Sequence, residues 1–206
     1  MKTRTKTAPG QASAPAAAAA AAAVAAPASA TLANLQTAYN GEINAQARYL
    51  AFAREAGEEG YAPVVSLFRA AARAEEIHAG NHAEAIRHLG GQPKASVEAV
   101  IVKSTRENLE VAVKGESYER DEMYPAFLHQ ARSDGIPSAA RTFHLAKKAE
   151  TEHAALFSLA LHELERLRGD SVVYYVCPVC GFTSSKADGT RCPVCATPVN
   201  RFEKLN

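Results

Sequence analysis

The feature that most constrains this chain is a repeated segment with the pattern F-x6-E-x2-H-A. It covers residues 68–79 and recurs at residues 143–154. The repeated pairs are Glu75 with His78 and Glu150 with His153. A Gly-Glu pair repeats in step, at residues 41–42 and 115–116. A unit used twice in this way predicts two related helical hairpins whose repeated residues have a common task.

Each of the four segments has apolar residues at alternating steps of three and four, which predicts a helix with one face toward other helices. The middle of each such face is polar. The inward-facing candidates are Glu42, Glu75, Glu116, Glu119, Glu150, His78 and His153. Burying an unpaired carboxylate is costly, and no Lys or Arg shares these faces. A bound cation is therefore expected.

The donor set indicates which cation. Carboxylate oxygen and imidazole without thiolate suit iron or manganese. One Glu from each of two helices, with Glu-x-x-His from two others, is typical of di-iron carboxylate bundles. Two divalent ions would nearly balance five carboxylates. The alternative is that these carboxylates are solvated and that the inward face of each helix has been assigned one residue off. Because four segments are polar at the same depth, this alternative is the weaker one.

The C-terminal region has a different character. A β-type run at residues 172–176 leads into two C-x2-C pairs separated by eleven residues. The pairs contain Cys177, Cys180, Cys192 and Cys195, all the cysteines of the chain. Two such pairs predict a tetrahedral four-thiolate site rather than disulfides. Spacing alone leaves zinc and iron open. So short a segment buries little core, so the metal is expected to stabilise its fold.

The fold class expected is mainly α: a four-helix bundle followed by a small metal-binding domain. The helices are expected at residues 31–56, 62–89, 104–133 and 137–167, with a crossover at 92–103 that contains a short helix at 97–102. Ser104 and Glu107 form a capping-box pattern. Pro125 falls inside the third helix, so a local irregularity is expected there. The domain boundaries expected are 1–30, 31–168 and 171–206.

Residues 1–30 are rich in Ala and Pro. They fit an unstructured tail and a cytoplasmic protein. The alternative is a secretory signal peptide and export, although the stretch lacks Leu, Ile and Phe. The Ala run is too short and too weakly apolar to span a membrane. The formal net charge is +1 and the chain has no cluster of basic residues, so nucleic acid is not expected as a partner.

The order of motifs closely resembles rubrerythrins. A Gly-Glu helix and a Glu-x-x-His helix are followed by a G-E-S-Y-E…M-Y-P helix, a second Glu-x-x-His helix and a C-P-V-C-G…C-P-V-C pair, across residues 31–206. The resemblance implies a ferritin-like bundle with two iron ions and a rubredoxin-like domain with one iron in its four-cysteine site. It also implies the reduction of hydrogen peroxide to water.

The resemblance implies roles for individual residues. The seven inward-facing Glu and His residues become di-iron ligands, and the four cysteines become rubredoxin-type ligands. Tyr49 and Tyr124 match tyrosines beside the iron pair, the alternative being core aromatics. Glu119 matches an additional carboxylate that exchanges with His78 at one iron. Ala196 departs from the pattern, which has Gly there. His82 lies on the inward face outside the motif and is interpreted as a polar core residue, with a metal role as the alternative.

These features predict a peroxidase relevant to oxidative stress. Its electrons would come from an NAD(P)H-dependent reductase, directly or through a rubredoxin-type carrier, because the chain has no Gly-rich nucleotide fingerprint. One rival is a ferroxidase or iron-handling protein with a structural zinc ribbon, and another is an electron-transfer or sensor module without turnover. The short connection at residues 167–172 predicts a homodimer in which the cysteine domain of one chain lies beside the di-iron site of the other.

Overall fold

The computed structural model describes Met1 and residues 25–206, so most of the predicted tail at residues 1–30 lies outside the described residues. Helix α1 (Ala25–Glu58) begins before the predicted start at residue 31. Alanine has the highest helix propensity, which extends the helix in the N-terminal direction.

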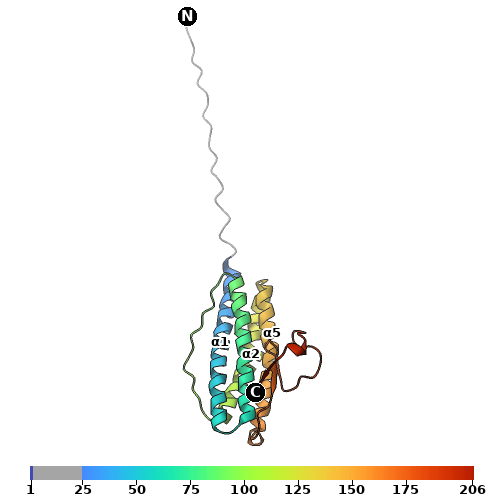
Figure 1. The fold of residues 1–206 in the computed structure, drawn as a ribbon. Coiled ribbons are helices and arrows are strands. Elements are labelled where there is room, and N and C mark those ends of the chain that lie inside the picture. The colour runs from blue at the N-terminus through green and yellow to red at the C-terminus, as the bar shows by residue number, and fades with distance from the viewer. Residues whose placement is uncertain (2–24) are drawn as a thin grey trace.

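The predicted mainly-α fold and four-helix bundle are confirmed (Figure 1). A short turn joins α1 to α2 as an antiparallel hairpin. The third helix of the bundle is continuous but changes character along its length. The remaining helical elements are α2 (Ala62–His88), α3 (Thr105–Tyr118), the π-helical turn η1 (Glu119–Met123), α4 (Tyr124–Ser133), α5 (Pro137–His162) and the 3-10 turn η2 (Leu164–Arg166). None of the described helices is both long and apolar enough to cross a membrane.

The third helix starts and is interrupted where the sequence predicts. The Ser104 side chain accepts a hydrogen bond from the backbone N–H of Glu107, and the Glu107 carboxylate accepts one from the backbone N–H of Ser104, which completes the capping box. The π-helical turn η1 ends just before Pro125. Because proline clashes with the carbonyl one turn earlier, a wider turn relieves the strain. The predicted irregularity is confirmed.

The crossover between the hairpins runs along α1 for much of the length of the bundle (Figure 1). The prediction of a short helix at residues 97–102 is wrong, because residues 91–104 contain no helix. Asparagine side chains of α1 supply the hydrogen bonds instead. Asn40 accepts from the backbone N–H of Ser96, and Asn44 accepts from that of Glu98. An extended backbone held in this way has no need of helical hydrogen bonds.

The bundle core consists of two apolar clusters with a polar layer between them. One cluster contains Phe52, Phe68 and Phe157, and the rings of Phe68 and Phe157 are 5.3 Å apart between centroids. The other contains Leu35 and Phe143. These clusters exclude water from both ends of the polar layer, which holds the predicted metal ligands.

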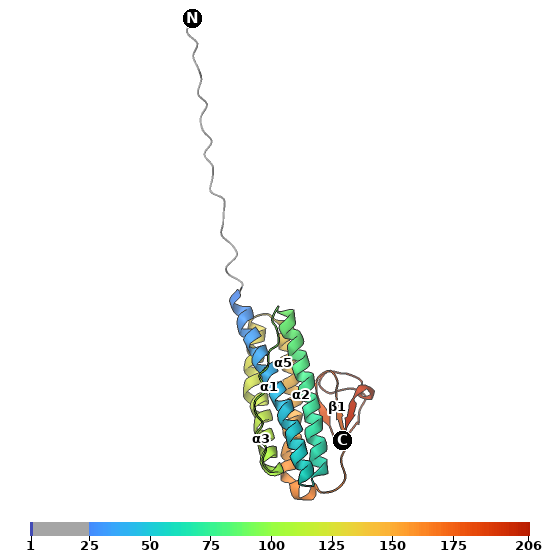
Figure 2. The same ribbon diagram turned by 60° about the vertical axis from the view of Figure 1, so that its left-hand side comes forward.

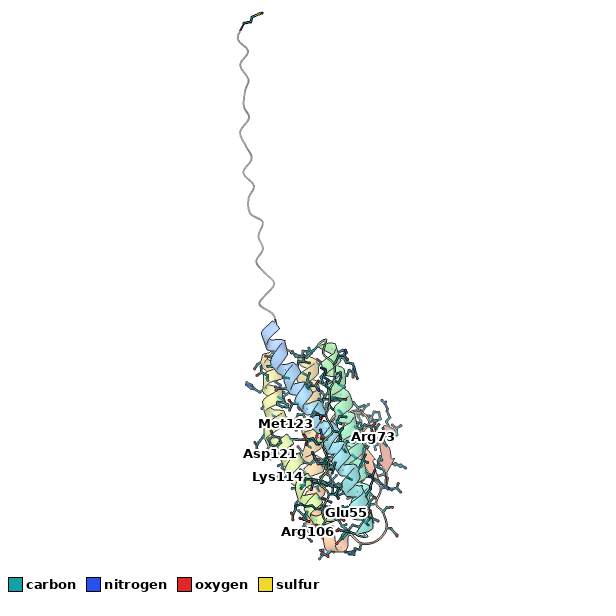
Figure 3. The ribbon with its side chains drawn as sticks, turned by 90° about the vertical axis from the view of Figure 1, so that its left-hand side faces the viewer. Glu55, Arg73, Arg106, Lys114, Asp121 and Met123 are labelled. Atoms are coloured by element: carbon teal, nitrogen blue, oxygen red, sulfur yellow. The ribbon has the colours of Figure 1, made fainter. Side chains whose placement is uncertain are left out.

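The C-terminal region forms a small antiparallel sheet in the order β2-β1-β3. Its elements are β1 (Tyr174–Val176), β2 (Thr183–Ser184), the 3-10 turn η3 (Val199–Arg201) and β3 (Glu203–Leu205). The sheet lies beside α2 (Figure 2), where Val176 packs against Ala74 and Ile77. Arg73, on the face of α2 toward the sheet (Figure 3), donates from Nε to Oε2 of Glu203 at 2.7 Å.

This packing corrects one expectation. The cysteine domain was predicted to lie near the di-iron site of a partner chain, because the fourth helix would end far from its own site, yet here the domain lies against the bundle of its own chain. Helix α5 continues for only about 14 Å beyond His153 at ~1.5 Å per residue. The residues between His162 and Cys180 are extended enough to return over that distance. Whether the protein is a dimer is a separate prediction.

Candidate metal centres

Six of the predicted ligands converge in the polar layer of the bundle. Their side chains are at most 1% exposed and come from four helices. They are Glu42 on α1, Glu75 and His78 on α2, Glu116 on α3, and Glu150 and His153 on α5. Their donor atoms form two groups within 4.8 Å, and both groups contain Glu75 and Glu150. If two neighbouring ions were bound, Glu75 and Glu150 would be the carboxylates available to both of them.

The buried polar atoms of this cluster fit cations. Several have no hydrogen-bond partner within the protein, although buried polar atoms normally have one. The atoms concerned are Oε2 of Glu42, Oε1 of Glu75 and Oε2 of Glu116. The two oxygens of Glu150 lie 2.9 Å from Nδ1 of His78 and 2.7 Å from Nδ1 of His153. Each of them is a lone-pair donor, and two iron ions would satisfy the whole set.

The ionisation of the cluster shows its demand for positive charge. Burial, and then repulsion from Glu150, raises the pKa of Glu116 to about 7. Burial and the neighbouring carboxylates also raise the pKa of Glu75. Burial alone would lower the pKa of His78 and His153, but the charge of Glu150 raises both. The protein therefore compensates its carboxylates with protons, and metal cations can replace those protons.

Glu119 lies at the edge of this cluster. It begins the π-helical turn η1, is half-buried, and belongs to neither close group of donor atoms. Burial and then the charges of Glu42 and Glu150 raise the pKa of Glu119, so its carboxyl group interacts electrostatically with the cluster. Its placement on an irregular turn is suited to a side chain that can move toward the cluster.

Both predicted tyrosines contact the cluster. The Tyr49 hydroxyl donates to Oε1 of Glu116 at 2.5 Å, and the Tyr124 hydroxyl donates to Oε1 of Glu42. Burial and the adjacent carboxylate raise the pKa of each phenol. The two tyrosines also pack in the core, as the alternative interpretation expected, because the ring of Tyr49 belongs to one apolar cluster and that of Tyr124 to the other.

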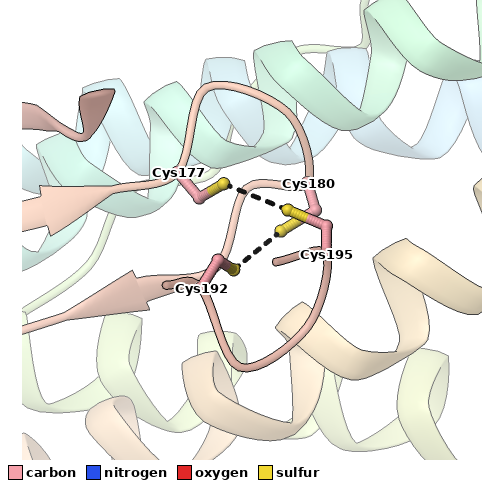
Figure 4. A group of neighbouring side chains, drawn as sticks. All are labelled: Cys177, Cys180, Cys192 and Cys195. Atoms are coloured by element: carbon pink, nitrogen blue, oxygen red, sulfur yellow. Dashed lines mark hydrogen bonds between the residues drawn. The ribbon is translucent and has the colours of Figure 1, made fainter. Parts of the chain in front are cut away.

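The four cysteines form the second centre. Two loops bring their sulfur atoms together (Figure 4), all within 4.8 Å of one another. The Sγ atoms of Cys177 and Cys195 are 3.5 Å apart, and those of Cys180 and Cys192 are 3.6 Å apart. All four are free thiols, so no disulfide forms here. This arrangement fits a single metal ion held by four thiolates.

The two centres meet through the backbone of the first cysteine loop. Nε2 of His78 donates to the carbonyl oxygen of Cys180 at 3.0 Å, and Nε2 of His153 lies 3.2 Å from that of Gly181. The hydroxyl of Thr183 is a second neighbour of His153, at 3.1 Å. Because the loop accepts from Nε2–H of each ring, Nδ1 faces the carboxylates, 2.9 Å from Glu150 in His78 and 2.7 Å in His153, and can give up its proton to bind a cation.

No local pattern in the sequence indicated this junction. The carbonyls of residues 180 and 181 carry no residue-type signal, and Thr183 belongs to no motif. Gly181 offers a partial signal, since its φ of 75° and its closeness to His78 both favour glycine. Ala196 occupies the corresponding position of the second loop with φ of 61°, so the departure noted in the sequence falls where an alanine is strained.

The comparisons with known proteins agree with this geometry. Residues 33–161 match the family model described as Rubrerythrin. The chain is 37% identical over 174 residues to nigerythrin of Nitratidesulfovibrio vulgaris, covering 84% of this chain and 85% of that protein. It is 36% identical to Rubrerythrin-2 of Clostridium acetobutylicum, covering 82% and 93% of the two chains.

Solved structures show the same relationship. Nigerythrin in a fully reduced, all-ferrous state superposes with a TM-score of 0.78 at 35% identity, covering 84% of this chain and 86% of that one. A bacterioferritin of Desulfovibrio desulfuricans superposes at 0.64 and 23% identity, covering 68% and 83%, which shows the ferritin-like fold alone. A bundle and a four-cysteine site joined in this order, together with these matches, establish that the chain belongs to the rubrerythrin family.

Proposed function

We propose that this protein is a non-haem di-iron peroxidase that reduces hydrogen peroxide to water with electrons delivered through its four-cysteine iron site. The proposed di-iron ligands are Glu42, Glu75, His78, Glu116, Glu119, Glu150 and His153, and the proposed ligands of the single iron are Cys177, Cys180, Cys192 and Cys195. When bound there, an iron pair would supply the two electrons needed to cleave the oxygen–oxygen bond. Each peroxide also takes up two protons and leaves as two water molecules.

The observation that carries this proposal is the hydrogen bond from His78 to the carbonyl oxygen of Cys180. One residue contributes a thiolate to the second centre and a backbone acceptor to an imidazole of the first. A zinc ribbon that served only its own fold would need no such contact. The contact is also buried, since His78 is 1% exposed. It favours a chain in which electrons enter the bundle through the cysteine loops.

The residues around the metals have distinct proposed tasks. The cysteine loop holds Nε2–H of His78 and His153, which keeps each Nδ1 turned toward the carboxylates. Tyr49 and Tyr124 each donate a hydrogen bond to a ligand carboxylate and restrict its orientation. Glu119 is the additional carboxylate and, by resemblance to the family, would exchange with His78 as a ligand if iron were bound there.

The proposed partners follow from the chemistry. Hydrogen peroxide is the oxidant, and an NAD(P)H-dependent reductase supplies electrons, directly or through a rubredoxin-type carrier. A homodimer and a cytoplasmic location complete the proposal. Gel filtration with light scattering tests the first, and cell fractionation tests the second.

The test combines metal analysis with turnover. Protein from iron-replete cells is expected to contain three irons per chain and to consume peroxide when NADH and a suitable reductase are supplied. Cys192→Ser is expected to lose the cysteine-bound iron, keep the iron pair and stop NADH-driven turnover. A colourless, zinc-filled cysteine site in a protein that oxidises ferrous iron, with no reductant-dependent peroxide consumption, would instead establish the ferroxidase alternative. Reversible reduction without turnover would establish the electron-transfer alternative.

A further inference from the structure

A buried histidine outside the two metal groups belongs to a continuous hydrogen-bonded chain. His82 on α2 is fully buried. Its Nδ1 lies 3.0 Å from the hydroxyl of Thr142 on α5, and its Nε2 lies 3.0 Å from the hydroxyl of Tyr124 on α4. The Tyr124 hydroxyl in turn donates to Oε1 of Glu42. Three side chains thus connect α5 to a carboxylate of the metal cluster.

The direction of every hydrogen in this chain can be assigned. The carboxylate of Glu42 only accepts, so Tyr124 uses its hydrogen there. The phenolic oxygen of Tyr124 must then accept from Nε2–H of His82. In neutral imidazole the other nitrogen carries a lone pair, so Nδ1 accepts from the hydroxyl of Thr142. All three hydrogens point toward Glu42.

The outer end of the chain reaches the surface. Thr142 lines a pocket of about 340 Å³ between α2 and α5, together with Asn81, Ser138 and Arg141. The pocket is polar enough to hold water that bonds to Thr142. The six clustered ligand side chains, in contrast, are at most 1% exposed, and Glu119 at the edge is half-buried. The chain therefore links solvent to Glu42, a fully buried member of the cluster.

We propose that Thr142, His82 and Tyr124 form a proton relay from this pocket to Glu42. The inference rests on the proposed peroxidase function, which consumes two protons per peroxide. In one transfer, solvent gives a proton to Thr142, Thr142 gives one to Nδ1 of His82, Nε2 gives one to Tyr124, and Tyr124 gives one to Glu42. Each step breaks one O–H or N–H bond and forms another, and no electron moves. His82 ends as the other neutral tautomer.

The variants separate a relay from simple packing. Thr142→Val keeps the shape and removes the hydroxyl, and Thr142→Ser restores the hydroxyl. His82→Phe keeps an aromatic ring beside Phe143 and removes both nitrogens. Ser138→Ala is the matched control, because Ser138 lines the same pocket outside the chain. Folding and iron content are checked for each variant by circular dichroism and metal analysis.

The first readout is peroxide turnover in H2O and D2O. We expect Thr142→Val and His82→Phe to lower kcat by about tenfold or more with little change in peroxide KM, and to change the solvent deuterium effect. Thr142→Ser should recover most of the rate, and Ser138→Ala should match the parent. Parent-like kcat and isotope effects in both variants would overturn the relay. A parent protein without peroxide turnover would overturn the peroxidase function itself, and with it the need for a relay.

The second readout does not depend on turnover. In zinc-loaded, diamagnetic protein labelled with nitrogen-15 at histidine, the relay predicts that His82 carries its hydrogen on Nε2. It also predicts that this hydrogen exchanges with solvent at least about tenfold more slowly in Thr142→Val than in the parent and in Ser138→Ala. A hydrogen on Nδ1 of His82, or an exchange rate unaffected by Thr142→Val, would contradict the relay even in an active peroxidase.

Discussion

Nε2 of His78 lies 3.0 Å from the carbonyl oxygen of Cys180. The carbonyl belongs to a cysteine of one metal site, and the imidazole belongs to the other site. This hydrogen bond sets the orientation of the His78 ring, so docking of the cysteine loops and the geometry of the di-iron site are physically linked. A substitution that alters the docking of the cysteine loops is therefore expected to alter the di-iron site, and the reverse is also expected.

Gly181→Ala should disturb this docking directly. A Cβ at residue 181 would overlap Nε2 of His78 and lie 2.9 Å from its Cδ2. We expect both sites to keep their iron while electron transfer from the cysteine site slows by about tenfold or more, a loss of about 1.4 kcal/mol of transition-state stabilisation. Stopped-flow absorbance of the cysteine-bound iron measures this rate. An unchanged rate would show that the contact is dispensable.

Ala196→Gly should stabilise the cysteine domain. Ala196 has φ of 61°, a conformation that costs a residue with a Cβ about 1 kcal/mol relative to glycine. The midpoint for loss of cysteine-bound iron absorbance in guanidinium should therefore rise. The same residue serves as a control for Gly181→Ala, since it shows that alanine can adopt positive φ in such a loop. A midpoint equal to or below that of the parent would count against strain at residue 196.

Removing the ion pair between Arg73 and Glu203 should weaken docking of the sheet on α2. Arg73 donates from both Nε and a terminal nitrogen to the two carboxylate oxygens of Glu203. Glu203→Gln is expected to increase hydrogen exchange in β3 and at the junction with α2. Glu76→Gln is the matched control, because Glu76 also pairs with Arg73 but lies on α2 itself. Equal exchange in the two variants would exclude a docking role.

The same pair gives a pH dependence. The hydrogen bond from Arg73 lowers the pKa of Glu203 below its usual 4.5. A depressed folded-state pKa means that the contribution is complete above about 4.5 and is lost as pH falls through the folded value. The exchange difference between Glu203→Gln and the parent should therefore shrink below pH 4.5.

Glu119→Ala should leave the bundle folded and lower peroxide turnover. The carboxyl group begins the π-helical turn and responds to the charges of the cluster. We expect a loss in kcat of about tenfold or more. Glu122→Ala, an exposed position on the same turn, is the control. Parent-like turnover of Glu119→Ala at full iron content would remove Glu119 from the mechanism.

Much of the bundle could be predicted because its signals are local. The Glu-x-x-His spacing places both side chains of a pair on one helical face. The capping-box pattern of Ser104 and Glu107 indicates the start of a helix within four residues. The prediction of a short helix at residues 97–102 was wrong for the opposite reason, because the hydrogen bonds of this segment are not local. Its backbone partners are Asn40 and Asn44, distant in sequence.

The junction of the two centres could not be predicted for a related reason. The contact from His78 to Cys180 joins a side chain to a backbone carbonyl across 102 positions. Backbone carbonyls are the same in every residue, so no residue type announces the partner. His82 is similar: its place on the inward face was visible in the sequence, but its bonds to Thr142 and Tyr124 depend on how α2, α4 and α5 pack.

The central claim is that electrons from the cysteine-bound iron serve the di-iron site. The most direct measurement mixes fully reduced protein with two equivalents of peroxide per chain in an anaerobic stopped-flow instrument and follows the absorbance of the cysteine-bound iron. We predict that this iron is oxidised as peroxide is consumed, and that it stays reduced in Glu150→Ala, where the di-iron site is damaged. Peroxide consumption by the parent with the cysteine-bound iron still reduced, or equal oxidation in Glu150→Ala, would contradict the account.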